Sequence, residues 1–453
     1  MRMNDGEPHS AAPLTWLAAA FVAASSTAIV QIGSDARWLA AIGAVIARAR
    51  AIPDAVAYAA VPSDGWHDAP ALGQLAFHGL ESLFGDKGLV LAQIAAVTVA
   101  VAVLALDLRR ADARDGAAAA ALLAVVVAAP ATFFVVRAEL FSLALFPVLV
   151  LLLRSESRFA SKRIWLVVPL VVLWANLHGG VLLGLGVLGA YLAFRRARSA
   201  PLESACVLAA SCLALLATPA LLGGVSYYAD VLRSGAVSER YGLWGPLSLH
   251  EPLDLLFVAI AVPLVAAAIR RRPAAWELVL LVALAVMSVE ARRNGIWLLL
   301  FAATPAARSF GAWRVPLVSR RLAIACCAAP LLIAGVGLSR PVAPGGAGAP
   351  LLQRALAAAN GSPILADPLD AEQVALHGGR ILIGNPIEAF PREHQRLYVD
   401  WLRGLPEGDA ILGAPIRIVL VERGSEPQER LAADSAFREL ARDERAVLYA
   451  ART

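Results

Sequence analysis

Charged residues and cysteines are both scarce in this chain of 453 residues. Only 17% of the residues are charged and 59% are apolar, whereas soluble domains average about 25% charged residues. The four cysteines have neither the spacing of a disulfide framework nor that of a zinc site, and we expect small buried side chains because all four lie in apolar stretches. No basic stripe with interleaved aromatic residues occurs, so a nucleic-acid partner is not expected.

The apolar residues are gathered in blocks of about 16–22 residues, a length that crosses a hydrocarbon core about 30 Å thick. These blocks are uninterrupted runs of Ala, Leu and Val, so they are expected to be helices and not the alternating strands of a barrel. The first block is too long for a signal-peptide core, which favours a retained anchor. We predict a polytopic α-helical membrane protein with about 11 transmembrane helices, over residues 14–33, 88–107, 116–136, 138–153, 164–177, 179–194, 201–222, 253–269, 274–291, 294–307 and 322–339.

Basic residues between the blocks predict the orientation of the chain. With eleven crossings, five clusters fall on one side of the membrane: Arg109, Arg110 and Arg114; Arg154, Arg158, Lys162 and Arg163; Arg195, Arg196 and Arg198; Arg270, Arg271 and Arg272; and Arg308, Arg314, Arg320 and Arg321. Short loops rich in Arg and Lys stay in the cytoplasm. The N-terminus is therefore expected on the cytoplasmic side of the inner membrane.

Three sizeable segments then fall on the non-cytoplasmic side: the outer loop (residues 34–87), residues 223–252, and the tail (residues 340–453). Within the outer loop, residues 36–50 and 69–84 have the pattern of amphipathic interfacial helices. Residues 1–339 thus form a transmembrane domain, 340–350 a linker, and 351–453 a small soluble α/β domain with a partly parallel sheet. Its strands are expected at 363–366, 380–383, 416–421 and 446–450, and its helices at 370–377, 391–403 and 426–442.

Ionisable residues at the edges of membrane helices are candidates for function, because their burial is costly. They come to a similar depth on the outer side: Asp35, Asp64, His67, Asp68, Arg137, Asn176, His178, Glu290, Arg292 and Arg293. A carboxylate such as Asp35 can take the proton of an attacking hydroxyl, while Arg and His side chains hold a phosphate. This set suits the transfer of a group from a lipid-linked phosphate ester.

Each candidate also has an ordinary structural interpretation. Asp35 could cap the helix that follows it, and Arg137 could extend to the lipid headgroups. His178 could form a hydrogen bond between helices as a neutral residue, and Arg292 and Arg293 could be interfacial anchors. Residues 64–68 could form a solvated turn, and Asp35 with Asp64, His67 or Asp68 could hold a divalent metal ion if the outer loop folds back.

The order of these motifs resembles the GT-C superfamily of membrane glycosyltransferases. The resemblance rests on Asp35-Ala-Arg-Trp38 and Trp66-His67-Asp68-Ala-Pro70 in the outer loop, on Arg137-Ala-Glu-Leu-Phe-Ser142, on Trp174-Ala-Asn176-Leu-His178-Gly-Gly180, on Arg292-Arg293-Asn294, and on the tail. Many members carry two acids after the first helix, whereas here Asp35 stands alone. The resemblance implies a polyprenyl-phosphate-sugar donor.

It further implies that Asp35 is the catalytic base of an inverting transfer on the outer face of the membrane. The residues expected to bind substrate are His67, Arg137, Asn176, His178, Arg292 and Arg293. Two alternatives stay open: a transporter or flippase of a lipid-linked anion, which would also suit the interrupted hairpin around residue 178, and a non-catalytic membrane scaffold.

Overall fold

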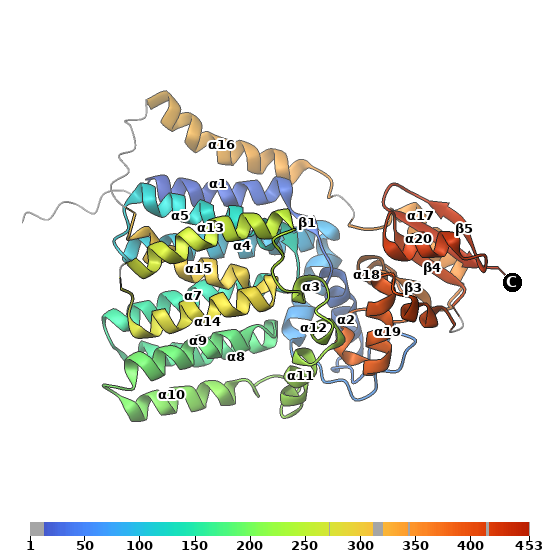
Figure 1. Ribbon diagram of the computed structural model, residues 1–453, viewed down its shortest axis with the longest axis horizontal. Helices are drawn as coiled ribbons and strands as arrows, with labels where there is room; N and C mark the ends of the chain where they lie inside the picture. Colours follow the sequence, from blue (N-terminus) through green and yellow to red (C-terminus); the bar gives the residue numbers. More distant parts are fainter. Residues whose placement is uncertain (1–12, 271, 311–319, 343–344, 414–415, 453) are drawn as a thin grey trace, which may run out of the picture.

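A bundle of apolar helices makes up most of the molecule, and the tail packs against one end of it (Figure 1). The computed structural model describes residues 13–270, 272–310, 320–342, 345–413 and 416–452. Each predicted block overlaps one main helix of the bundle: α1 (Pro13–Ile29), α4 (Asp86–Arg110), α5 (Asp115–Ala128), α7 (Leu140–Arg158), α8 (Val167–Leu177), α9 (Val181–Tyr191), α10 (Pro201–Ala214), α13 (Pro252–Arg270), α14 (Ala275–Glu290), α15 (Gly295–Ala307) and α16 (Arg320–Ser339).

Three of the described helices, α4, α7 and α13, are long and apolar enough to cross a membrane on their own. Four shorter apolar helices accompany them: Pro13–Ile29, Asp115–Ala128, Pro201–Ala214 and Ala328–Ser339. The α-helical bundle is therefore as expected, while the number of crossings stays a prediction. The expectation of buried cysteines is wrong for Cys206 and Cys212, which are exposed. Both lie on α10, at the outer edge of the bundle in Figure 1, and the apolar side chains of Leu202 and Leu213 on this helix are exposed as well.

The basic clusters of three predicted loops contact one another at the end of the bundle away from the tail. Arg158 donates a hydrogen bond to the Arg110 carbonyl, and Arg195 donates one to the Ser157 carbonyl. The start of α1 lies at the same end, because Asp115 accepts hydrogen bonds from the amides of Leu14 and Thr15. We call this the basic end. Residues 1–12, Arg271 and Arg314 lie outside the described residues, as do the side chains of Arg320, Arg321, Cys326 and Cys327.

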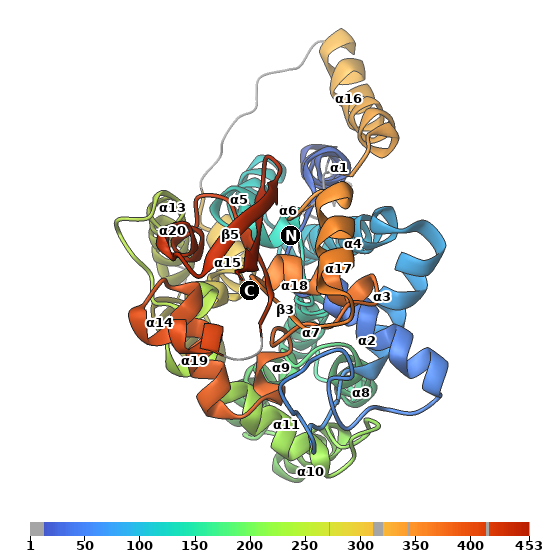
Figure 2. The same cartoon turned by 90° about the vertical axis from the view of Figure 1, so that its right-hand side faces the viewer.

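The outer loop and the tail share one hydrophobic core, separate from the core of the bundle. The two helices predicted in the outer loop are present as α2 (Ala36–Ala49) and α3 (Ala71–Phe84). Helix α2 packs between α3 and α18 (Pro368–Leu376) of the tail, and Figure 2 shows the tail in front of the bundle. The segment 223–252 forms α11 (Gly223–Leu232), α12 (Gly235–Ser238) and η3 (Gly242–Trp244) beside them.

The tail is a small α/β unit with a four-stranded sheet in the order β3-β4-β6-β5. Strands β3 (Ile364–Ala366) and β4 (Ile418–Glu422) are parallel, while β6 (Ala446–Ala451) pairs antiparallel with β4 and with β5 (Phe437–Arg442), so the sheet is partly parallel as predicted. Its other elements are α17 (Ala349–Ala359), α18, η5 (Ile387–Ala389), α19 (Arg392–Leu402), η6 (Pro406–Gly413) and α20 (Glu426–Ala433).

Two predictions for the tail are wrong. The helix expected over 426–442 ends at Ala433, and Phe437–Arg442 is an edge strand, whose solvated Arg and Glu side chains resemble a helix in the sequence. The strand expected over 380–383 forms isolated bridges only: Ile381 pairs with Ala59 of the outer loop and with Ile364. This segment divides its backbone hydrogen bonds between two neighbours, so it joins the outer loop to the tail and does not extend the sheet.

Candidate functional site

A two-residue parallel ladder brings the end of the first helix beside the turn that carries Arg137. Gln31 pairs with Val135 and Ile32 with Val136, in strands β1 (Gln31–Ile32) and β2 (Val135–Val136). The amide of Gly33 extends the ladder by donating to the Val136 carbonyl at 3.1 Å. A Cβ atom on Gly33 would lie 2.4 Å from Val135 Cγ1, so this close approach requires glycine. Asp35 and Arg137 therefore leave adjacent strands side by side.

Asp35 is held at the site by contacts with its side chain and its backbone. Its Oδ2 lies 3.6 Å from Arg137 Nη2, and its Oδ1 accepts a hydrogen bond of 3.1 Å from Asn385 Nδ2. Its backbone has φ of 83°, a left-handed conformation that is strained for a non-glycine residue. It stands at the N-cap position of α2, but its side chain makes no capping hydrogen bond. The carboxylate is thus used for contacts across the site and not as a helix cap.

The tail supplies three polar side chains to this site: Glu372, Asn385 and Glu388. Glu372 is fully buried, and its Oε1 accepts hydrogen bonds from the Asp35 amide at 2.7 Å and from Asn385 Nδ2 at 2.9 Å. Burial, reinforced by the neighbouring Asp35 carboxylate, raises the pKa of Glu372 to about 8. Burial also raises the pKa of Glu388 to about 7. Glu372 of the tail therefore lies beside Asp35. The sequence motif around Asp35 contains no second acid, so the tail supplies it.

Sequence reasoning missed Glu372 and Glu388 as site residues. The Asn385-Pro386 turn and the helix beginning near residue 370 are visible in the sequence, but nothing local distinguishes their acids from other acids of the tail. The feature that distinguishes Glu372 is its burial, which it shares with Asp370 of the same helix and which only the structure shows.

Two sequence motifs interlock around His178, which follows α8 and precedes α9. The indole N–H of Trp174 donates to Ser142 Oγ at 2.7 Å, and Ser142 Oγ lies 2.6 Å from His178 Nδ1. The backbone amide of Gly180 also donates to His178 Nδ1, at 3.2 Å. Because Nδ1 accepts from this amide, it carries no proton, and the ring presents its Nε2–H as a donor. A Cβ atom on Gly180 would lie 2.5 Å from Ser142 Oγ, which explains the glycine.

Arg292 and Arg293, adjacent in η4 (Arg292–Asn294), point to different places. Arg293 lines the cavity, stacks its guanidinium over the Trp244 ring at 4.1 Å from the centroid, and lies 3.9 Å from Glu139 Oε2. Arg292 is turned to α13, where Asp254 Oδ2 lies 3.7 Å from its Nη1, and it does not line the cavity. The arginine turn therefore contributes one cation to the cavity.

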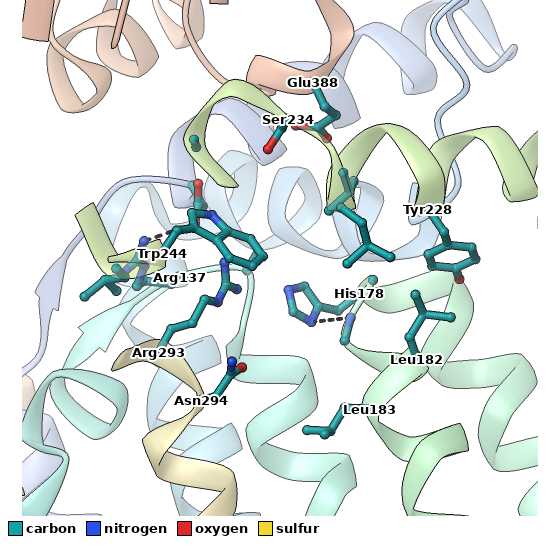
Figure 3. A pocket seen from close by; sticks show the side chains of 18 of the residues that line it. Arg137, His178, Leu182, Leu183, Tyr228, Ser234, Trp244, Arg293, Asn294 and Glu388 are labelled. Carbon is teal, nitrogen blue, oxygen red and sulfur yellow. Dashed lines mark hydrogen bonds and ion pairs between the residues drawn. The ribbon is translucent and has the colours of Figure 1, made fainter. Parts of the chain in front are cut away.

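A cavity of about 990 Å³ lies between the bundle, the outer loop and the tail. Its polar wall holds Asp35, Arg137, His178, Arg293, Asn385 and Glu388. Figure 3 shows Arg137, Arg293 and His178 around one space, with Ser234 and Glu388 across from them. An apolar arm runs between α9 and α14, lined by Leu182, Leu183, Val187, Val279, Leu280 and Met287. Val279 and Met287 are partly exposed there, so the arm reaches the surface of the bundle.

Comparison with solved structures finds a similar fold in known proteins. No protein-family profile and no curated protein sequence matches the chain. Among solved structures it is similar to the arabinofuranosyltransferase AftD from Mycobacteria (16% identity, TM-score 0.53) and to apo ArnT from Cupriavidus metallidurans (14% identity, TM-score 0.52), each over 96% of this chain. Both are GT-C glycosyltransferases. The chain has the GT-C fold.

The chain spans about two fifths (41%) of the length of AftD and 97% of that of ArnT. ArnT has also been solved with undecaprenyl phosphate bound, a structure that this chain matches with a TM-score of 0.49. The GT-C fold agrees with the fold expected from the sequence motifs.

Within this GT-C fold, the remaining sequence candidates lie away from the cavity wall. Asn176 donates to the carbonyls of Val172 and Ala217, which ties the end of α8 to the segment after α10. His67 Nδ1 lies 3.2 Å from Ser226 Oγ at the surface. Roles for these two residues in substrate binding stay predictions without support from their positions.

Asp64 and Asp68 of the outer loop are not among the residues that line the cavity with Asp35. Asp68 is buried, its Oδ1 accepts from Gln74 Nε2 at 2.7 Å, and burial raises its pKa to about 7, whereas Asp64 is exposed. In the described part of the chain, no three His, Cys, Asp or Glu side chains come together as metal ligands. The divalent ion considered from the sequence stays a prediction.

Proposed function

We propose that this protein is a membrane glycosyltransferase that moves a sugar from a polyprenyl-phosphate donor to an acceptor hydroxyl or amide on the outer face of the cytoplasmic membrane. The observation that carries the proposal is the cavity that Asp35 shares with Arg137, His178 and Arg293. One carboxylate and several phosphate-binding donors, brought together from distant parts of the chain, are the groups that such a transfer needs.

The cavity also fits the two halves of the donor. The apolar arm between α9 and α14 reaches the surface of the bundle and suits a polyprenyl chain. Arg137, Arg293 and the Nε2–H of His178 would hold the phosphate at the inner end of that arm. The sugar would then lie near Asp35 and Trp244, and the acceptor would enter beside Glu388 and the tail.

The reaction follows from this placement. Asp35 takes the proton of the acceptor as the acceptor oxygen or nitrogen attacks the anomeric carbon. The bond from that carbon to the phosphate oxygen breaks, and the electron pair leaves with the polyprenyl phosphate. Attack from the face opposite the phosphate inverts the anomeric centre. Arg137 and Arg293 stabilise the negative charge that grows on the phosphate, most effectively where water is excluded.

The test is transfer of a radiolabelled sugar from a polyprenyl-phosphate donor by the purified, reconstituted protein. Asp35→Asn is expected to lower transfer by about 100-fold to 10,000-fold, the usual range for loss of a general base. The matched control is Asp64→Asn, an exposed acid of the same loop. Asp35→Asn protein that folds, inserts and transfers sugar at the wild-type rate would overturn the proposal.

The same vesicles distinguish the alternatives. A flippase would move the labelled lipid between leaflets without transferring the sugar. A scaffold would show neither activity, and substitutions at Asp35 and Arg137 would have no consequence, whereas deletion of 350–453 would abolish its role.

A further inference from the structure

The N-terminus of helix α2 is capped in an unusual way. The first amides of a helix have no partner within it, and a side chain at the N-cap position normally accepts from them. Aspartate is among the residues preferred there. Asp35 occupies the position in α2, yet its side chain makes no capping bond and its φ is 83°.

The capping acceptor comes instead from Glu372, 337 residues further along the chain. Its Oε1 accepts from the Asp35 amide at 2.7 Å, and its Oε2 accepts from the Arg37 amide at 3.2 Å. Only 2% of Glu372 is exposed, so the contact is protected from water. One carboxyl group of the tail therefore accepts hydrogen bonds from two amides at the start of α2.

The side chain of Asp35 is thereby released for the cavity. Asn385 donates from one Nδ2 atom to both Asp35 Oδ1 and Glu372 Oε1, at 3.1 and 2.9 Å, and so connects the two carboxyl groups. Arg137 faces the other oxygen of Asp35, at 3.6 Å. Without Glu372, the amides of Asp35 and Arg37 would lose these acceptors, and the backbone of Asp35 would lose a contact that fixes it beside the cavity.

We infer that Glu372 is a positioning residue for Asp35: it caps helix α2 from the tail and so keeps the carboxylate of Asp35 in the cavity. This inference rests on the proposed function for the role of Asp35, but the cap itself does not. It also gives the tail a part in the reaction, because Glu372 and Asn385 both belong to it.

The experiment has a kinetic arm and an exchange arm, both with the full-length protein in detergent or vesicles. The variants are Glu372→Ala, which removes both acceptor atoms, and Glu372→Gln, which keeps one. The control is Glu393→Ala, an exposed glutamate of the same tail. Each is measured alone and in the Asp35→Asn background.

In the kinetic arm, Glu372→Ala is expected to lower kcat about tenfold or more, because the lost cap also orients the base. The KM for the donor should change less than about twofold, since Glu372 does not bind the donor. Glu372→Gln falls between Glu372→Ala and wild type. In the Asp35→Asn background, Glu372→Ala has no further effect on the residual rate, because it acts through Asp35. A kcat for Glu372→Ala equal to that of the control, or an equal loss in both backgrounds, overturns the positioning role.

In the exchange arm, hydrogen–deuterium exchange is followed on peptides covering residues 33–40. Glu372→Ala is expected to speed exchange of the protected amides about tenfold or more, whereas Glu393→Ala leaves it unchanged. Unchanged exchange in Glu372→Ala overturns the cap. The exchange arm needs no substrate. A wild-type protein that transfers no sugar would therefore refute the proposed function alone, and the exchange rates would still test the cap.

Discussion

The arginines at the basic end and those at the cavity are held in different ways. At the basic end, Arg154 is 5% exposed and is bonded to Asp107, to Glu277 Oε1 at 3.3 Å and to the Phe301 carbonyl at 2.7 Å. At the cavity, Arg137 and Arg293 are 26% and 24% exposed, and their nearest carboxylate oxygens lie 3.6 and 3.9 Å away.

This difference separates a structural use of arginine from a binding use. All three guanidinium nitrogens of the buried Arg154 donate hydrogen bonds within the protein, and these bonds connect α4, α7, α14 and α15 at the basic end. Long contacts in a partly open cavity leave donors available for a phosphate. The intramembrane charges of this protein are therefore not all candidates for function, although each is costly to bury.

Removing Arg154 should have the largest effect on stability. Arg154→Ala leaves the buried Asp107 and the partly buried Glu277 without this cation, which is expected to cost about 3–5 kcal/mol. The unfolding temperature and the yield of folded protein in detergent measure this loss. Arg158→Ala, at an exposed arginine of the same helix, is the control and should change little. Equal stability of Arg154→Ala and Arg158→Ala would show that the contacts of Arg154 do not stabilise the bundle.

Arg292 and Arg293, which are adjacent in η4, test whether an arginine that lines the cavity contributes to transfer. Arg293→Ala should lower sugar transfer about 10-fold to 100-fold, because charge-assisted hydrogen bonds contribute about 1.5–3 kcal/mol. Arg292→Ala, whose side chain is turned to Asp254, should reduce transfer far less. The transfer assay on both variants decides the matter, and a larger loss for Arg292→Ala would show that the wrong arginine has been assigned to the phosphate.

A smaller effect is expected from Gly180→Ala. Its new Cβ would lie 2.5 Å from Ser142 Oγ and 2.9 Å from His178 Nδ1, so the imidazole must shift within the cavity. We expect about a tenfold loss of transfer, since small misplacements of binding groups are costly. Gly189→Ala on the same helix adds a Cβ in open space and serves as the control. Wild-type transfer by Gly180→Ala would argue against a role for His178.

The smallest expected effect concerns pH. Burial raises the pKa of Glu372 from 4.5 to about 8, so the folded protein keeps this proton where the unfolded chain loses it. The stability contributed by Glu372 is complete below about pH 4.5, falls as the pH rises and is gone above about pH 8. Glu372→Gln lacks this dependence, so its unfolding temperature relative to wild type should rise by about 1–3 °C between pH 5 and pH 8. A difference in unfolding temperature between Glu372→Gln and wild type that does not change with pH would contradict the raised pKa of Glu372.

Much of the bundle could be predicted because membrane helices are encoded locally. Blocks of apolar residues and basic clusters are visible without any partner, and each predicted block overlaps a helix. His178 could be predicted for the same reason, since the break in the hairpin lies in the sequence around it. Asn176, two residues earlier, could not be separated from His178 by pattern, because side-chain direction at a helix end depends on packing.

The contributions of the tail could not be predicted. Glu372 faces Asp35 only because outer loop and tail share one core, a contact between residues far apart in the chain. The strand Phe437–Arg442 was missed for a related reason: its pairing with β6 decides its structure, and its own residues do not.

The cap on helix α2 also sets an order of events during synthesis. A ribosome that has made the first helix and the outer loop has produced Asp35, yet its partners Glu372 and Asn385 are encoded much later in the chain. A nascent or truncated chain can therefore contain Arg137 and Arg293 while Asp35 still lacks its contacts with Glu372 and Asn385. Under the proposed function, completion of the last quarter of the polypeptide would then be the step that assembles the reactive centre.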